Sequence, residues 1–132
     1  MRSARFHDFV LDLVKNAPGV RVQTLAEAGD TKHPRGLAIT TQDGEARWQI
    51  IGQLAEGEKH EDADVPVAGD PIQGWQEPNL GHAEGWLAAV IARSESPEIA
   101  SIERWSTRPG DEKRHGMTIV FHNGAKAFVR KI

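Results

Sequence analysis

The sequence predicts an α+β fold of two helix-plus-three-strand units (αβββ-αβββ) that form antiparallel sheet with both helices packed on one face. The first observation behind this prediction is a pair of dipeptides, Asp43-Gly44 and Asn123-Gly124. Each lies between two runs of alternating apolar residues, which is the strongest short-range signal for a β-hairpin. The second observation is the order of these patterns along the chain. Each hairpin is preceded by an amphipathic helical pattern and one further apolar run, and the two sets lie roughly eighty residues apart.

The first unit is expected within residues 1–54. Apolar residues recur there at helical spacing, ahead of the stop signal Ala17-Pro18-Gly19. Ser3 is the expected N-cap of that helix. The expected elements are a helix at 3–16 and strands at 20–25, 37–42 and 45–51.

The second unit is expected within residues 80–132, with Asn79 as the N-cap of its helix. Between the units lies an acidic, Pro-rich segment, residues 55–79, which has the composition of a linker or a long surface loop. We therefore expect one domain, residues 1–132, with an internal pseudo-repeat. The expected elements of the second unit are a helix at 80–94 and strands at 99–107, 116–122 and 125–132.

Composition limits the classes of function. The chain has 132 residues, a net charge of -3 and no cysteine. The absence of cysteine excludes a disulfide framework, a thiolate metal site and a thiol nucleophile. No apolar run resembles a signal peptide or a membrane span, so we expect a cytoplasmic protein with no membrane partner.

Two-residue turns would fix which residues face each other in the hairpins. In the first hairpin the expected pairs are Ile39 with Trp48 and Leu37 with Ile50, and the outer face is polar. In the second hairpin the residues expected on the core face are Met117, Ile119, Phe121, Phe128 and Ile132. The residues expected on its outer face are Thr118, Val120, Ala127 and Val129.

This apolar outer face indicates a surface that needs a cover. The cover is residues 55–79 folding back, a second copy of the chain, or a foreign partner. The leading interpretation is a non-catalytic cytoplasmic binding or assembly module that acts through a protein–protein surface, with a homodimer as one form. Trp75 is either an anchor of the acidic segment or part of that binding surface. The predicted surface comprises Thr118, Val120, Ala127, Val129 and Trp75.

The second interpretation is a nucleic-acid-associated protein. Basic residues concentrate in the second unit near Trp105 and Phe128, and such side chains neutralise phosphates and stack on bases. The negative net charge argues against this interpretation. The predicted patch comprises Arg104, Arg108, Lys113, Arg114 and Lys126.

The third interpretation is a small enzyme or ligand carrier with a cavity between helices and sheet. No Ser lies in a nucleophile turn, no glycine-rich phosphate loop is present, and the six His residues are scattered. The acidic run at 60–64 has no metal-ligand spacing and is typical of a solvated loop. We therefore assign no catalytic residue, no metal ligand and no cofactor from the sequence.

Overall fold

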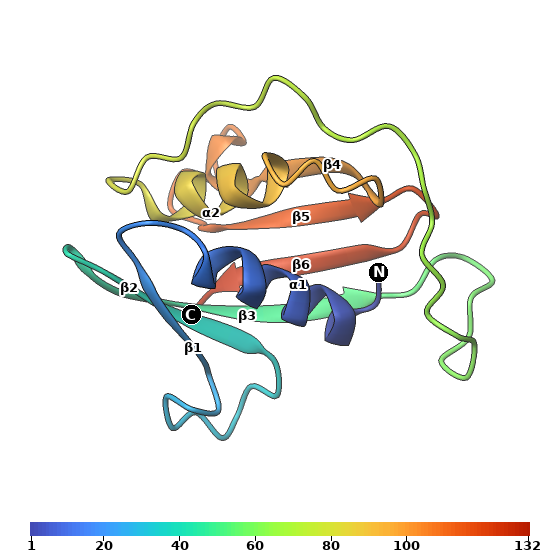
Figure 1. Ribbon diagram of the computed structural model, residues 1–132, viewed down its shortest axis with the longest axis horizontal. Helices are drawn as coiled ribbons and strands as arrows, with labels where there is room; N and C mark the ends of the chain where they lie inside the picture. Colours follow the sequence, from blue (N-terminus) through green and yellow to red (C-terminus); the bar gives the residue numbers. More distant parts are fainter.

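The computed structural model describes residues 1–132 and has the predicted α+β class, with two helices packed on one face of a six-stranded antiparallel sheet (Figure 1). In space the strands follow the order β1-β2-β3-β6-β5-β4, so one sheet spans both halves of the chain. The elements along the chain are α1 (Ser3–Lys15), β1 (Arg21–Thr24), β2 (Gly36–Thr41), β3 (Gly44–Gln53), α2 (Ala83–Ala92), β4 (Ile99–Arg104), the 3₁₀ turn η1 (Trp105–Thr107), β5 (Gly116–Phe121) and β6 (Lys126–Lys131).

The outer strand pairs of the two halves have matching registers. Val22 of β1 lies opposite Ile39 of β2, and Ile102 of β4 lies opposite Ile119 of β5, with corresponding residues 80 positions apart. The sheet order is also symmetric about the central β3–β6 pair. The internal repeat itself, as a shared origin of the two halves, stays a prediction.

The two helices differ in how much of their surface is covered. Helix α1 fully buries one stripe, Phe6, Val10 and Val14, and exposes polar residues such as Asp8 and Asp12, as expected of a helix with solvent on one side. Helix α2 is apolar almost all round and buries seven of its ten residues. Trp75 packs on the core beside it from the segment between β3 and α2. Neither helix combines the length and apolar composition that crossing a bilayer requires.

The predicted helix caps are wrong. Arg2 holds the N-cap position of α1 and makes no side-chain cap bond, so Ser3 is the first helical residue. The N-cap of α2 is His82, whose Nδ1 accepts from the Gly85 N–H at 3.1 Å. Asn79 acts one turn earlier, where its Oδ1 accepts from the Gly81 N–H.

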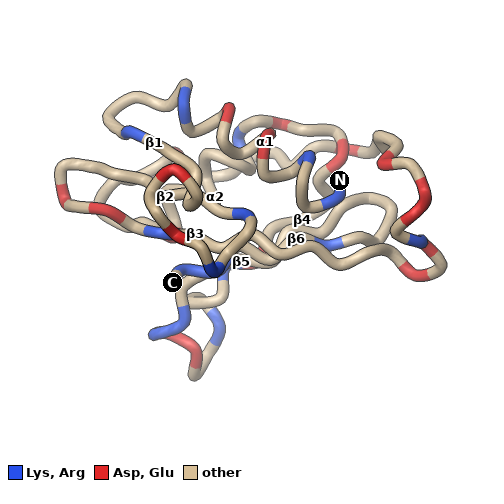
Figure 2. The backbone as a smooth tube through the Cα atoms, turned by 90° about the horizontal axis from the view of Figure 1, so that it is seen from below, with Lys and Arg blue, Asp and Glu red and all other residues tan.

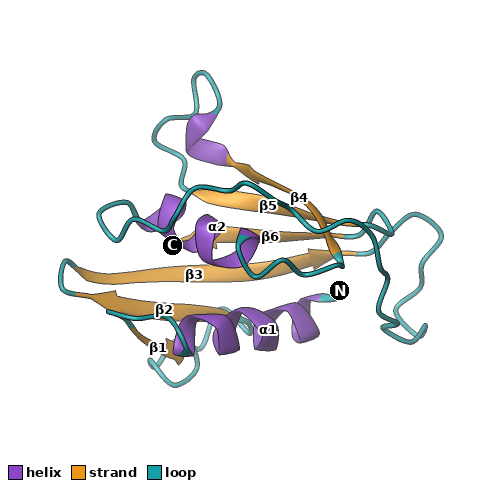
Figure 3. Cartoon of the chain, turned by 45° about the horizontal axis from the view of Figure 1, so that its top comes forward, coloured by secondary structure: helices purple, strands orange, loops and turns teal.

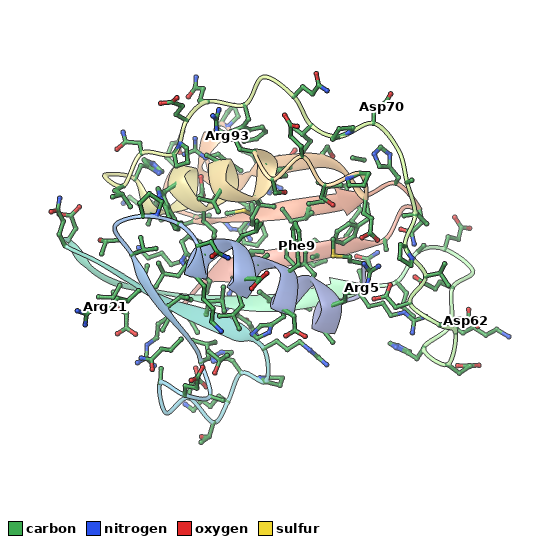
Figure 4. The ribbon with its side chains drawn as sticks, in the orientation of Figure 1. Arg5, Phe9, Arg21, Asp62, Asp70 and Arg93 are labelled. Carbon is green, nitrogen blue, oxygen red and sulfur yellow. The ribbon has the colours of Figure 1, made fainter.

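Residues 54–82 form neither helix nor strand, yet they are tied to the rest of the molecule (Figures 3 and 4). The Arg5 guanidinium on α1 donates to both oxygens of Asp64, each at 3.0 Å, and to both oxygens of Glu98, each at 2.7 Å. Farther along, Arg93 donates to the Trp75 carbonyl at 3.0 Å. These contacts hold the segment on the helix side of the sheet, so the prediction that it folds over the outer face is wrong.

The first hairpin turns through Gln42 and Asp43 rather than Asp43-Gly44. Leu37 therefore pairs with Trp48, and Ile39 pairs with Ala46. The predicted pairs are wrong by two residues. Because side chains alternate with a period of two, the predicted faces are nevertheless correct.

The second hairpin has a three-residue loop, His122-Asn123-Gly124, closed by the Phe121 N–H donating to the Ala125 carbonyl at 2.9 Å. Gly124 has φ +89°, the left-handed conformation that such loops require. The extra loop residue shifts the register by one, so Met117 pairs with Val129. A shift of one residue turns β6 over. The predicted outward placement of Ala127 and Val129 is therefore wrong, because both are fully buried in the core.

Candidate functional site

The outer face of the sheet, opposite the helices, carries an apolar row across its central strands. Thr118 of β5 lies opposite Phe128 of β6, and Phe128 lies opposite Ile51 of β3. Val120 stands in the next row on β5. Ile51 is 44% exposed, and the other three side chains are half-buried. We name Ile51, Thr118, Val120 and Phe128 the outer patch.

Two loops close over the outer face on either side of its centre. Leu25 lies over Gly36, where an added Cβ would stand 2.4 Å from the leucine Cδ1. Trp105 lies over Gly116, where an added Cβ would stand 2.4 Å from the indole Cε3. Only glycine permits such close approach. The outer patch begins in the next row of the sheet, where Thr118 touches the Trp105 cover through a hydrogen bond and Ile51, Phe128 and Val120 lie beyond it.

The charges around the outer patch are mainly positive. Lys126 and Arg130 flank Phe128 on β6 and face outward with it, and neither has an acidic partner. The outward-facing acidic side chains of the strands are already in ion pairs, Glu45 with Arg47 at 3.3 Å and Glu103 with Arg108.

At one end of the outer face, basic side chains surround Trp105. The Arg114 and Arg108 guanidinium groups lie 5.6 and 5.9 Å from the indole centroid, within the range of cation–π attraction. Figure 2 shows Lys and Arg gathered near the C-terminus and on the loop beside it, whereas acidic residues follow the loop near the N-terminus. We name the depression of about 250 Å³ at this end the Trp105 cradle; its lining is Trp105, Lys113, Arg114, His115, Arg130 and Lys131.

A buried carboxylate on α2 positions Trp105. The Glu84 side chain is wholly buried and accepts from the Gly116 N–H at 2.9 Å and from Arg104 Nε at 2.9 Å. It also accepts from the Ser106 N–H at 3.2 Å and from the Ser106 hydroxyl at 2.5 Å. These bonds join α2 to the start of β5 and to the turn that carries Trp105. In addition, Trp105 Nε1 donates to the Thr118 hydroxyl at 2.9 Å.

The Glu84–Ser106 contact resembles a base beside a nucleophile, but its electrostatics are those of a structural anchor. Burial alone raises the pKa of Glu84, while the hydrogen bonds from Ser106, Gly116 and Arg104 lower it, and the net pKa lies below the ordinary value. A charged carboxylate with four donors is a weak proton acceptor. The contact therefore supports folding rather than acid–base catalysis.

The structure brings together only part of the predicted binding surface. Thr118 and Val120 face outward as predicted. Ala127 and Val129 lie in the core instead, on the opposite side of the sheet. Trp75 packs beside α2 on the helix side, where it anchors the segment 54–82. The three misplaced residues cannot form one surface with the other two.

The predicted nucleic-acid patch is also divided. Arg108, Lys113 and Arg114 gather around Trp105. Arg104 points to the helix side, where it binds Glu84. Lys126 stands in the row of Val120, four residues along β6 from Arg130. These last two residues are therefore not part of the cradle.

Sequence reasoning missed Ile51 and Phe128 as surface residues, and Arg130 and Lys131 as cradle residues. A signal was present in β6, where Lys126, Phe128 and Arg130 alternate with small or aliphatic residues. Two charged residues four positions apart lie on the same face of a strand and mark its solvent side. No such signal identifies Glu84, because its donors come from residues 20 to 32 positions away.

Comparison of this chain with protein-family models, with curated proteins and with solved structures finds no match. The functional interpretation therefore depends on the geometry of the surface alone.

Proposed function

We propose that this protein is a non-catalytic binding or assembly module, and that the outer patch binds a protein partner. The observation that carries the proposal is the partly exposed apolar pair Phe128 and Ile51, with Val120 in the next row, at the centre of the sheet. The chain has a long segment available as a cover, yet that segment is bound on the helix side. Apolar surface at the centre of a sheet face is stabilised by burial against a partner.

The chemistry of the patch favours protein over nucleic acid as its partner. Ile51 and Val120 are aliphatic and cannot stack on a base, whereas they gain free energy when buried against apolar side chains. Lys126 and Arg130 on the same face favour a partner with carboxylates around an apolar centre. In a two-fold dimer that packs outer face on outer face, these cations would stand close to their own copies. Like charges in an interface are unfavourable, so a foreign acidic partner fits better than a second copy.

Photo-cross-linking tests this proposal in cells that naturally contain the protein. We expect p-benzoylphenylalanine placed at Phe128 to cross-link to a distinct protein, because this side chain lies at the centre of the patch. The same group placed at Asp8, which is exposed on α1, is the matched control and should give no such product. Equal products from both positions, or none from Phe128, would contradict the proposal.

Light scattering of the purified protein separates the two kinds of protein partner. If the partner is a foreign protein, we expect the purified protein to be a monomer. A dimer that Val120→Asp dissociates would instead identify a second copy as the occupant of the patch. A dimer that withstands both Val120→Asp and Ile51→Asp would show that another surface mediates assembly.

The Trp105 cradle supports a second candidate function, binding of single-stranded nucleic acid. Lys113, Arg114 and Arg130 have no acidic partner, so their charges are free to neutralise phosphates. Single-strand binding sites combine such charges with aromatic side chains on which bases stack. Trp105 is only 8% exposed, so stacking would require its edge or a movement of the loop.

Fluorescence polarisation with a mixed-sequence single-stranded oligonucleotide tests the second candidate. Three phosphate contacts predict that log K falls with log salt concentration with a slope of about -2. The double variant Lys113→Gln/Arg114→Gln should weaken binding, whereas Lys59→Gln, at the distant acidic loop, should not. Absence of binding at low salt, or equal effects of the two variants, would reject this candidate.

A further inference from the structure

A half-open cavity of about 190 Å³ lies on the helix side of the sheet. It is bounded by the residues before and at the start of α2, by the β2–β3 hairpin and by the end of β6, which meet on the left in Figure 1. Its apolar lining comprises Ile39, Ala46, Trp48, Leu80 and Trp86. An apolar cavity of roughly 150 Å³ is large enough for benzene. This one therefore accommodates a single apolar group of about the size of one ring.

The cavity is separate from the outer patch. Ile39, Ala46 and Trp48 point toward the helices, whereas the outer-patch side chains project from the other face of the sheet. A ligand in the cavity would not touch Phe128 or Val120. The inference below therefore goes beyond the proposed function and does not depend on it.

The rim of the cavity carries both signs of charge. Asp43 comes from the β2–β3 hairpin, and Lys131 comes from the end of β6. The Asp43 carboxylate has no hydrogen-bond or ion-pair partner, although its backbone N–H donates to the Thr41 hydroxyl. Glu45 also borders the cavity, but its side chain faces the other side of the sheet, where it pairs with Arg47 at 3.3 Å. Lys131 has no acidic partner.

These charges fit the two ends of one small ligand. Lys131 attracts a carboxylate, and the positive end of the α2 dipole adds to this where Ala83 borders the cavity. Asp43 attracts an ammonium group. The apolar lining, which includes two tryptophans, excludes a polar side chain but accepts an aliphatic or aromatic one.

We propose that this cavity binds a free amino acid with an apolar side chain. The side chain occupies the space beside Trp48 and Trp86. The carboxylate lies toward Lys131, and the ammonium group lies toward Asp43. An amino acid carries both charges on one carbon, so it satisfies both sides of the rim at once, which neither an amine nor an acid alone does.

Titration of the full chain followed by ¹H–¹⁵N NMR tests the proposal with three probes of nearly equal size. L-phenylalanine carries both charges, phenethylamine lacks the carboxylate, and 3-phenylpropionate lacks the ammonium group. We expect saturable shifts of the Trp48 and Trp86 indole signals with L-phenylalanine, with a Kd on the order of 1 mM or below. Each truncated probe should bind roughly tenfold more weakly, which corresponds to about 1.4 kcal/mol.

Variants of the charged rim residues test which residue binds each end of the ligand. Lys131→Gln, at an exposed position, should remove the preference for L-phenylalanine over phenethylamine. Asp43→Asn should remove its preference over 3-phenylpropionate, whereas Glu45→Gln, on the outer face, should not. Ala46→Leu fills the cavity and should abolish binding of all three probes, while Val120→Asp on the other face should change none.

Two results would overturn the proposal. One is the absence of saturable shifts at the cavity with L-phenylalanine up to about 20 mM, more than tenfold above the expected Kd. The other is equal binding of the three probes, which would mean that the rim charges do not select a zwitterion. The exposed Lys131→Gln variant keeps the test decisive even if Ala46→Leu fails to fold.

Discussion

The two halves of this protein have matching registers in their outer strand pairs but hold the glycine at the start of each hairpin with different chemistry. In the first half, His7 of α1 bonds to the carbonyl oxygen of Gly36 at 3.1 Å, and Leu25 lies over that glycine. In the second half, Glu84 of α2 accepts from the N–H of Gly116 at 2.9 Å, and Trp105 lies over that glycine. A helix side chain thus holds the glycine that begins each hairpin.

The two halves also differ in the outer face, which is mostly polar in the first half and presents an aromatic side chain among cations in the second. The first half has a partly buried imidazole and an aliphatic cover. The second half has a buried carboxylate with four donors, and this anchor holds an aromatic side chain among free cations. Most residues of the two proposed binding surfaces lie in the half with the stronger anchor, and a binding surface needs positioned side chains.

Removal of the Glu84 anchor should have the largest effect. Glu84→Ala leaves the Arg104 charge and three further donors without their partner, so we expect a loss of about 3–5 kcal/mol in the free energy of unfolding. The matched change in the first half, His7→Ala, removes one bond and should cost about 1 kcal/mol. Urea denaturation of both variants measures the difference. Equal losses would show that the two anchors are equivalent.

A methyl group on Gly116 should have the next largest effect. Gly116→Ala places a Cβ against the Trp105 ring and 2.6 Å from the Val129 carbonyl, so we expect a loss of about 2–3 kcal/mol. The indole should also move away from Arg114, with a change in its near-ultraviolet circular dichroism. Gly29→Ala is a control in a first-half loop, where the Cβ would meet open space and only the positive φ is unfavourable. Unchanged tryptophan signals in Gly116→Ala would contradict the close contact.

Acid should loosen the attachment of the segment 54–82 to α1. The hydrogen bonds from Arg5 lower the pKa of Asp64 from 3.8 to about 2. A carboxyl with a lowered folded-state pKa stabilises the fold above its unfolded pKa and loses that contribution as pH falls through the folded one. Stability from Asp64 should therefore decline between about pH 4 and pH 2.

The variant Asp64→Asn isolates this contribution. At pH 7 it should be less stable than the wild type by roughly 1–2 kcal/mol, the size of a hydrogen bond to a charged group. Its stability should then fall less steeply between about pH 4 and pH 2. Glu61→Gln, exposed in the same acidic loop, is the control. Parallel pH profiles for the wild type and Asp64→Asn would contradict the assigned role.

Deletion of Asn123 should have the smallest effect and sharpens the comparison of the hairpins. It shortens the second loop to two residues, the length found in the first hairpin. Ala127 and Val129 are fully buried, so we expect the core to retain the register at a cost of about 1 kcal/mol or less. Contacts between Met117 and Val129 in NMR spectra would confirm the retained register. A structure with Phe128 facing the helices would show that the loop length, and not the core, sets the register.

The sequence was sufficient for the element order and for the core faces of the first hairpin, because alternation and Asx-Gly turns are local signals. Trp48, on the core face of that hairpin, is buried. The faces of β6 could not be predicted from the turn alone, since loops of two and three residues both contain Asn-Gly. The register was decided by the core, which prefers Ala127 and Val129 to a strand with Lys126 and Arg130 pointing inward.

The candidate site was harder to predict because it depends on contacts between distant residues. Ile51 and Phe128 become neighbours only through the β3–β6 pairing, which joins the two ends of the chain. Glu84 meets its donors only when α2 lies beside the start of β5. The sequence left two interpretations of Trp75, an anchor of the acidic segment or part of the binding surface. Its packing beside α2 identifies it as an anchor.

The most direct test of the central claim is the affinity of the cross-linked partner for two outer-face variants. Val120→Asp places a charge in the outer patch, whereas Thr40→Asp places one on the polar part of the same face. We predict that Val120→Asp weakens binding by at least ~30-fold, about 2 kcal/mol, and that Thr40→Asp changes it by less than about twofold. Equal affinities of the two variants, with both proteins folded, would contradict the claim that the outer patch is the binding surface.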